Sequence, residues 1–288
     1  MLLSDQFVRR NIMLKITMSN IENFTYLFDT KNDQFQNISW AEPIFIAMAR
    51  AYQNDEEITL YIDNEYVRNM IQSSYKENRT YSPIEQIRSR TGLEKISSHL
   101  TSIMLQNFTS LSQTDQKDLR DYLQYLFLEL MNNVADHSHS PVGGYAMAQY
   151  YPAGKKIQFV VADRGVAFLK NMQLNFADIQ NEEEAIIKAL QKGITSTEEK
   201  MYGQPKNAGF GLYAMFEILK MTGGKFVIIS NDTLLRYESE QFEIKKLSTP
   251  WEGVVASFEF FEANINYKMD EFTSNYLWNI DDEDEDYF

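Results

Sequence analysis

The stretch ELMNNVADHS, residues 129–138, closes a long helical pattern and carries side chains suited to nucleotide chemistry. Apolar residues leading into it recur at three- and four-residue steps and predict one buried stripe: Leu119, Leu123, Leu126, Phe127, Leu130 and Val134. Glu129 and Asn133 are four residues apart, so they lie one turn from each other on the opposite face, which Asp136 continues. An amide oxygen suits Mg²⁺, and a carboxylate one turn away can hold a water for attack on a phosphate. The alternative is an ordinary solvated helix face.

A second segment, VVADRGVAF at 160–168, ends a nearly all-apolar run that predicts a central strand. Asp163 follows that strand directly, where a carboxylate could accept a hydrogen bond from the exocyclic amine of adenine. Gly165 has no Cβ, so the backbone there could approach a base closely. The alternative is a plain turn after a strand.

A third segment, NAGFGLYAM at 207–215, places Gly209 and Gly211 before a predicted helix. Free backbone amides at such a helix N-terminus could meet phosphate oxygens. The alternative is that the paired glycines only begin a helix. This segment therefore indicates a phosphate site only in combination with the other two segments.

The three segments together resemble the nucleotide site of the GHKL ATPases, the superfamily of the gyrase B subunit, histidine kinases and MutL. The resemblance assigns Mg²⁺ binding to Asn133 and general-base catalysis to Glu129. It extends over roughly residues 113–262 and implies that ATP is held by a larger set: Asn133, Asp136, His137, Asp163, Gly165, Ala167, Lys206, Asn207, Gly209, Phe210, Gly211 and Leu212.

The chain departs from the family pattern at three places. Ala167 stands where the Asp-x-Gly-x-Gly box has its second glycine. Val254 follows Gly253 where many members carry a threonine, and Ser257 is a poor positional substitute. His99 lacks the acidic residue that follows a phospho-acceptor histidine, so we do not expect an autophosphorylating sensor kinase. For His137, a helix C-terminal histidine favoured by the helix dipole is the simpler alternative.

The resemblance implies an ATP- and Mg²⁺-binding regulatory protein that hydrolyses ATP or phosphorylates a protein serine or threonine. The alternatives are a non-catalytic, nucleotide-gated protein-interaction module and a degenerate fold without nucleotide. The long connection 164–208 would be the ATP lid. Further phosphate contacts could come from its Lys192, Thr195, Ser196 and Lys200.

The order of patterns predicts an α/β protein with two domains. Residues 1–112 read as strand 33–40, helix 41–53, strand 57–63 and helix 64–75, a small α/β domain similar in outline to STAS-like regulatory domains. The resemblance implies a Bergerat-type two-layer α/β sandwich over 113–265. An acidic tail, 266–288, would follow.

Composition narrows the classes of function. The chain has 288 residues and no cysteine, which excludes disulfides and thiolate chemistry and fits the cytoplasm. It has no apolar run long enough for a membrane span, and charges near its N-terminus argue against a secretion signal. The net charge of −14 gives direct nucleic-acid binding little support. We expect a protein partner at the N-terminal domain, and a homodimer remains open.

Overall fold

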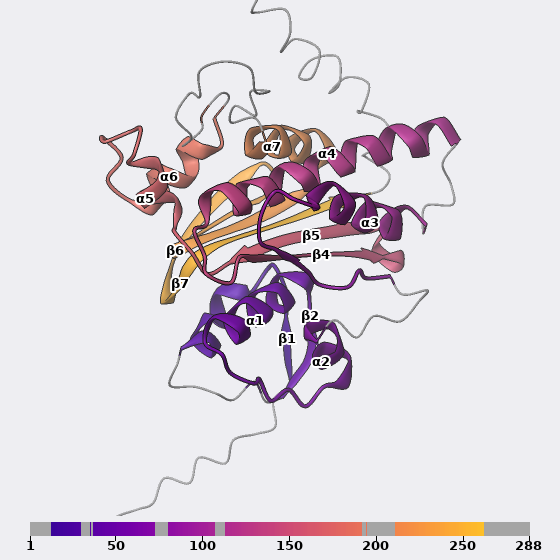
Figure 1. Ribbon diagram of the computed structural model, residues 1–288, viewed down its shortest axis with the longest axis horizontal. Helices are drawn as coiled ribbons and strands as arrows, with labels where there is room; N and C mark the ends of the chain where they lie inside the picture. Colours follow the sequence, from indigo (N-terminus) through magenta and orange to yellow (C-terminus); the bar gives the residue numbers. More distant parts are fainter. Residues whose placement is uncertain are drawn as a thin grey trace, which may run out of the picture.

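The computed structural model describes residues 13–29, 35, 37–72, 80–106, 113–191, 194 and 211–261. Over these ranges the chain is a mixed α/β protein whose main element is an antiparallel five-strand sheet, as Figure 1 shows. Its strand order is β3-β4-β5-β7-β6, with β3 at Glu85–Ile87, β4 at Gly144–Tyr151, β5 at Lys156–Asp163, β6 at Lys225–Glu238 and β7 at Gln241–Phe261.

The predicted central strand is β5, which lies between β4 and β7 and is buried over nearly its whole length. The short 3-10 helix η3, Pro152–Gly154, joins it to β4, and the pairing sets Gly144 opposite Asp163. β6 and β7 form a long antiparallel hairpin. Their two-residue turn holds Ser239 and Glu240 at φ 52° and 62°, without the glycine or asparagine that usually marks such a turn.

One face of the sheet is covered by three helices in Figure 1: α3 at Leu93–Leu105, α4 at Gln113–His137 and α7 at Gly211–Thr222. The predicted stripe of α4 is buried against this face. Phe127 stacks on Phe159 of β5 with ring centroids 4.0 Å apart and planes at 8°. The amphipathic pattern of α4 therefore predicted correctly which side packs on the sheet.

The opposite face of the sheet is covered by the N-terminal elements, below the sheet in Figure 1. They comprise η1 at Ile21–Asn23, η2 at Thr25–Phe28, α1 at Pro43–Asp55, α2 at Glu65–Ile71 and the parallel strands β1 at Leu14–Ile16 and β2 at Ile38–Ala41. The rings of Phe28 and Trp251 of β7 lie 5.2 Å apart edge to face. One apolar core thus joins this N-terminal unit, residues 13–72 as described, to the sheet, so the described residues form three layers.

The prediction of a strand at 57–63 is wrong. Residues 58–62 have no strand assignment, and Glu57 turns the chain after α1 with φ 53°. Leu60 and Ile62 are nevertheless buried. An alternation of apolar residues indicates that one side of a segment is buried, but it does not show that the segment pairs as a strand. The partner of β2 is instead β1, which the sequence reading missed.

The domain boundary expected near residue 112 stays a prediction, as does the STAS-like outline. β3 and α3 precede that boundary, yet β3 pairs with β4 and α3 packs on α4, both of which lie largely beyond it. Within the described ranges, none of the helices combines the length and apolar character that crossing a bilayer requires.

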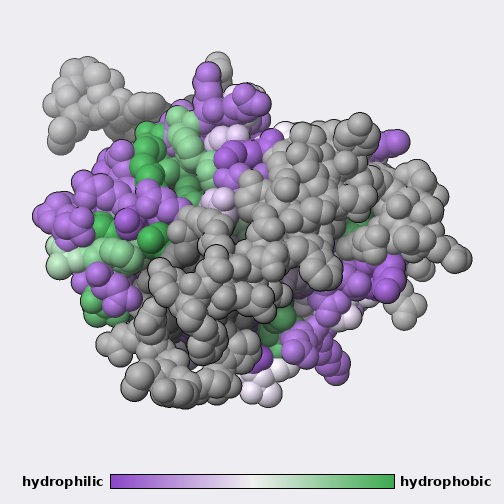
Figure 2. All heavy atoms as spheres, turned by 90° about the horizontal axis from the view of Figure 1, so that it is seen from above, coloured by the Kyte–Doolittle hydropathy of each residue, from purple (hydrophilic) through white to green (hydrophobic). Residues whose placement is uncertain are grey.

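The connection predicted as a lid is partly described. It contains α5 at Phe168–Met172 and α6 at Glu182–Ala189, at one end of the sheet in Figure 1. Seen from the helix side in Figure 2, this end of the molecule shows apolar and polar surface side by side. Several expected site residues lie outside the described residues: Lys192, Thr195, Ser196, Lys200, Lys206, Asn207, Gly209 and Phe210. The acidic tail lies outside them as well.

Candidate functional site

A pocket opens between the C-terminal half of α4, the C-terminal end of β5, the interior of β7, and the helices α5 and α7. It brings together most of the described site residues that the sequence predicted: Glu129, Asn133, Asp136, His137, Asp163 and Leu212. Its volume of ≈ 120 Å³ is below the range of about 300–1,000 Å³ usual for small-molecule sites. The described residues therefore enclose enough space for only part of a nucleotide.

α4 presents a buried acid and an exposed amide to this pocket. Glu129 is buried, whereas Asn133, one turn later, is exposed. The neighbouring Asn132 is buried as well and forms a hydrogen bond with Glu129. Glu129 and Asn133 thus extend from the interior of the pocket to its solvent side. The sequence did not point to Asn132 as a contact of Glu129.

Opposing effects set the protonation of Glu129. Burial raises the pKa of this carboxyl, while the charge of Arg90 and the hydrogen bond from Asn132 lower it. Arg90 also donates two hydrogen bonds to the carboxylate of Asp136: Nε lies 2.8 Å from Oδ1 and Nη2 lies 2.5 Å from Oδ2. Asp136, expected among the nucleotide ligands, is therefore engaged by an arginine that lies 46 residues earlier and that no local motif indicates.

Asp163 is the most buried of the polar residues that line the pocket, at 2% exposed. Its Oδ1 accepts a hydrogen bond of 3.0 Å from the backbone N of Gly165. Burial nevertheless raises the pKa of Asp163 to about 7, with backbone hydrogen bonds from Gly165 and Val254 opposing the shift. A carboxyl with such a pKa in a cleft is a common mark of a functional site.

The turn after Asp163 is packed too tightly for side chains at two glycines. A Cβ on Gly165 would lie 1.9 Å from the carbonyl oxygen of Ser138. A Cβ on Gly253, at φ 115°, would lie 2.3 Å from the carbonyl oxygen of Asp163. The structure thus gives Gly165 a packing role in addition to the approach to a base that the sequence suggests.

The departures from the family pattern have simple local consequences. Ala167 caps α5 with φ −72° and ψ 168°, which any residue adopts, so alanine causes no backbone strain there. Val254 lines the pocket with an apolar side chain where a threonine would add a hydroxyl. Ser257 is out of phase with Val254 and Ala256, the two β7 residues that line the pocket, and so does not replace that hydroxyl.

A buried polar network holds α5 beside the pocket. Ser230 Oγ donates to Glu182 Oε2 at 2.6 Å and accepts from the backbone N of Phe168 at 2.9 Å. Asn171 Nδ2 donates to the backbone O of His137 at 2.9 Å. Burial also lowers the pKa of His137, which favours the neutral ring at pH 7.

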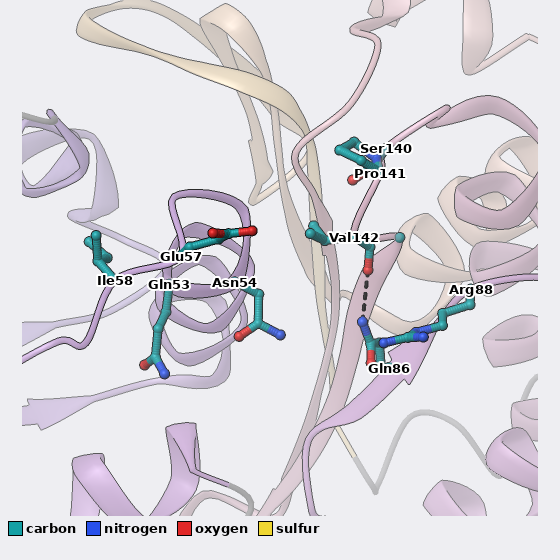
Figure 3. A pocket seen from close by; sticks show the side chains of 10 residues that line it. Gln53, Asn54, Glu57, Ile58, Gln86, Arg88, Ser140, Pro141 and Val142 are labelled. Atoms are coloured by element: carbon teal, nitrogen blue, oxygen red, sulfur yellow. Dashed lines mark hydrogen bonds between the residues drawn. The ribbon is translucent and has the colours of Figure 1, made fainter.

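A second cleft, shown in Figure 3, lies between the end of α1, strand β3 and the loop at 140–143. It is larger, ≈ 520 Å³, and Gln86 Nε2 donates to the backbone O of Val142 at 2.8 Å along one wall. None of the predicted site residues lines it. We regard the first pocket as the candidate site because buried titratable groups converge there.

A cation site made of protein ligands alone is not evident in the described residues, where no group of three or more His, Asp or Glu side chains is arranged to hold a metal ion. Mg²⁺ does not require such a cluster, because it usually keeps several waters and shares phosphate oxygens with one or two protein ligands. Asn133, on the solvent side of the pocket, could serve as one of them.

Comparison with known proteins gives no relative: no family model matches the chain, and no curated protein is significantly similar to it.

Proposed function

We propose that this protein binds ATP with Mg²⁺ in the pocket beside α4, as a regulatory ATPase or serine/threonine kinase of the GHKL type with a Bergerat-like fold. The observation that carries the proposal is that Glu129 and Asn133 of α4 and Asp163 of β5 line one pocket. The order of elements, with α4 and α7 on one face of the sheet, supports the same assignment.

Burial suggests how a nucleotide would be oriented. The base would enter the closed end, where Asp163 accepts a hydrogen bond from the adenine amine and apolar walls such as Val254 and Leu212 flank the ring. The phosphates would extend toward exposed Asn133, the side on which Mg²⁺ and water are accessible. Guanine has a carbonyl in place of the amine, so it would lose the hydrogen bond to Asp163.

Glu129 would act as the general base. It has to be ionised to accept a proton from water or a hydroxyl, and burial opposes this. The positive charge of Arg90 counters the effect of burial and so helps to keep the carboxylate available. Mg²⁺, when bound, would supply charge neutralisation at the phosphates.

Calorimetric titration with ATP and GTP tests the binding. Above pH 7, where Asp163 is mostly ionised, we expect tighter binding of ATP than of GTP, and a loss of tenfold or more with Asp163→Asn, since a buried charged hydrogen bond contributes about 1.5–3 kcal/mol. Asp178→Asn, which removes an exposed carboxylate outside the pocket, should bind as the parent does. Equal affinity of the parent for ATP and GTP would remove the role of Asp163 in reading the base.

The second candidate is a nucleotide-gated module without turnover, and the burial of Glu129 is the observation that favours it. Phosphate release and phosphotransfer separate the two. With a base at work, Glu129→Gln lowers turnover on the order of 10²-fold and leaves ATP affinity within a few-fold. The exposed Glu94→Gln is its control. Binding without turnover in the parent would favour the module, with the N-terminal unit as its partner-binding surface.

A further inference from the structure

Arg164 directly follows Asp163 of the candidate pocket, yet Arg164 does not line that pocket. It is 6% exposed and reaches the end of α1 in the N-terminal unit. Its Nε lies 2.9 Å from Asp55 Oδ2, and its Nη2 lies 2.8 Å from Glu56 Oε1. A cation is also favoured at this place by the partial negative charge at the C-terminus of a helix. Adjacent residues thus point to opposite sides: Asp163 to the pocket and Arg164 to α1.

Aromatic contacts fix the guanidinium further. It lies 5.4 Å from the ring centroid of Tyr52 in α1 and 5.1 Å from that of Trp251 in β7. The indole Nε1 of Trp251 in turn donates to the backbone O of Asp163 at 2.9 Å. The same indole therefore contacts the arginine and holds the peptide group that precedes it.

The backbone around these contacts has no free space. A Cβ on Gly253 would come within 2.9 Å of Arg164 Cα and closer still to its two neighbours. A movement of Arg164 would consequently shift Asp163 and Gly165. Since packed interiors transmit small displacements, the anchor on α1 and the wall of the pocket form one mechanical unit.

We propose that Arg164 is a positioning residue of the nucleotide pocket, which makes the recognition of the base by Asp163 depend on the N-terminal unit through Asp55 and Glu56. This inference rests on the proposed function, because it concerns the base that the pocket would bind. Arg164 touches no nucleotide itself. It acts by holding the turn from which Asp163 projects.

The chain offers a matched control in Arg236 of β6. Its side chain is 8% exposed and also ties the sheet to the N-terminal unit, with Nη2 lying 2.7 Å from Glu22 Oε2 and 3.1 Å from the backbone O of Met18. It does not line the pocket. Loss of either arginine removes an ion-pair partner from half-buried carboxylates, so both variants should lower the thermal midpoint.

The experiment compares Arg164→Ala, Arg164→Lys and Arg236→Ala in the full chain. We expect Arg164→Ala to weaken ATP about tenfold or more while changing GTP less, so that the preference for ATP over GTP falls. Arg236→Ala should keep the parent's preference. Arg164→Lys should fall between them, because lysine keeps the charge but not the planar fork that engages two carboxylates. An unchanged preference in folded Arg164→Ala, or an equal change in Arg236→Ala, overturns the proposal.

A second measurement needs no nucleotide and separates the failure of this inference from that of the proposed function. A carboxyl ¹³C titration should give the parent Asp163 a pKa of about 7. In Arg164→Ala this pKa should move toward the ordinary value, because a displaced turn exposes the carboxyl to water. Arg236→Ala should leave it unchanged.

If the parent binds no ATP, the proposed function fails, and this titration alone decides whether Arg164 positions Asp163. An identical pKa in Arg164→Ala overturns the positioning role. Should Arg164→Ala fail to fold, Arg164→Lys and the half-buried pair Asp55→Asn with Glu56→Gln carry the same comparisons.

Discussion

At the scale of single residues, the buried carboxyl of Asp163 links local structure to stability, and in the proposed function also to ATP binding. Burial raises its pKa to about 7 from the ordinary value of 3.8, so the folded protein holds this proton more tightly than the unfolded chain does. The contribution of this group to the free energy of unfolding must therefore fall as pH rises from about 4 to about 7, by at most roughly 1.4 kcal/mol per pH unit.

The first prediction isolates that contribution. Asp163→Asn removes the titrating group, so its stability relative to the parent should rise between pH 4 and pH 7 and level off above the folded pKa. Urea unfolding of both proteins at several pH values measures the difference. A difference that is flat over this window would show that the carboxyl is hydrated in the folded state.

The second prediction concerns Gly165. A Cβ there meets the carbonyl oxygen of Ser138 at 1.9 Å, so Gly165→Ala forces the turn away from the loop after α4. We expect a loss of about 1–3 kcal/mol, in the range of overpacking, together with weaker ATP binding. Gly154→Ala is the control, because its Cβ would meet only the Lys156 side chain at 3.4 Å or more. Equal effects of the two changes would contradict the tight packing of this turn.

At the scale of elements, the packing of α4 on β5 supports the pocket from behind. Phe127 is fully buried and stacks on Phe159, while Glu129, two residues later on α4, lines the pocket. The third prediction is that Phe127→Ala lowers the free energy of unfolding by about 3–5 kcal/mol, whereas Phe127→Leu, which leaves a smaller cavity, costs less. Thermal and urea unfolding measure both. Similar losses for both variants would indicate that the ring stacking itself dominates.

The fourth prediction concerns the β6–β7 hairpin. Glu240 occupies the left-handed region at φ 62°, which costs a residue with a Cβ about 1 kcal/mol. Glu240→Gly should therefore leave stability unchanged or raise it by up to about 1 kcal/mol. Glu238→Gly, within the strand, should lower it by about 0.5–1 kcal/mol. Urea unfolding of the two variants gives the comparison, and destabilisation by Glu240→Gly would contradict the turn geometry.

At the scale of the whole molecule, the N-terminal unit serves as the second cover of the sheet. Side chains of the sheet face toward it are fully or almost fully buried: Tyr145, Met147, Val160, Ala162, Val227, Ile229 and Val255. The fifth prediction is that residues 80–288 alone bind a hydrophobic dye and unfold without cooperativity, because this apolar face becomes exposed. If the fragment unfolds cooperatively and keeps the parent's ATP affinity, the N-terminal unit is a separable domain.

The sequence by itself determined those features that depend on short-range periodicity. The buried stripe of α4 and the place of Asp163 at the end of a central strand both follow from apolar spacing within a few residues. Glu129 and Asn133 could be placed on one side of a helix for the same reason. The resemblance of three segments to the GHKL nucleotide site, and not this periodicity, predicted which residues would meet at one pocket.

Only the tertiary structure decided how distant segments meet. Arg90 reaches Asp136 across 46 positions and Arg164 reaches Asp55 across 109, and an exposed or buried arginine has no periodic signal that identifies its partner. Contacts between distant segments also decide that the N-terminal unit covers the second face of the sheet. They likewise decide that residues 57–63 do not form the expected strand. Alternating apolar residues in a sequence indicate that one side of a segment is buried. Which surface that side packs against depends on the packing of the whole chain.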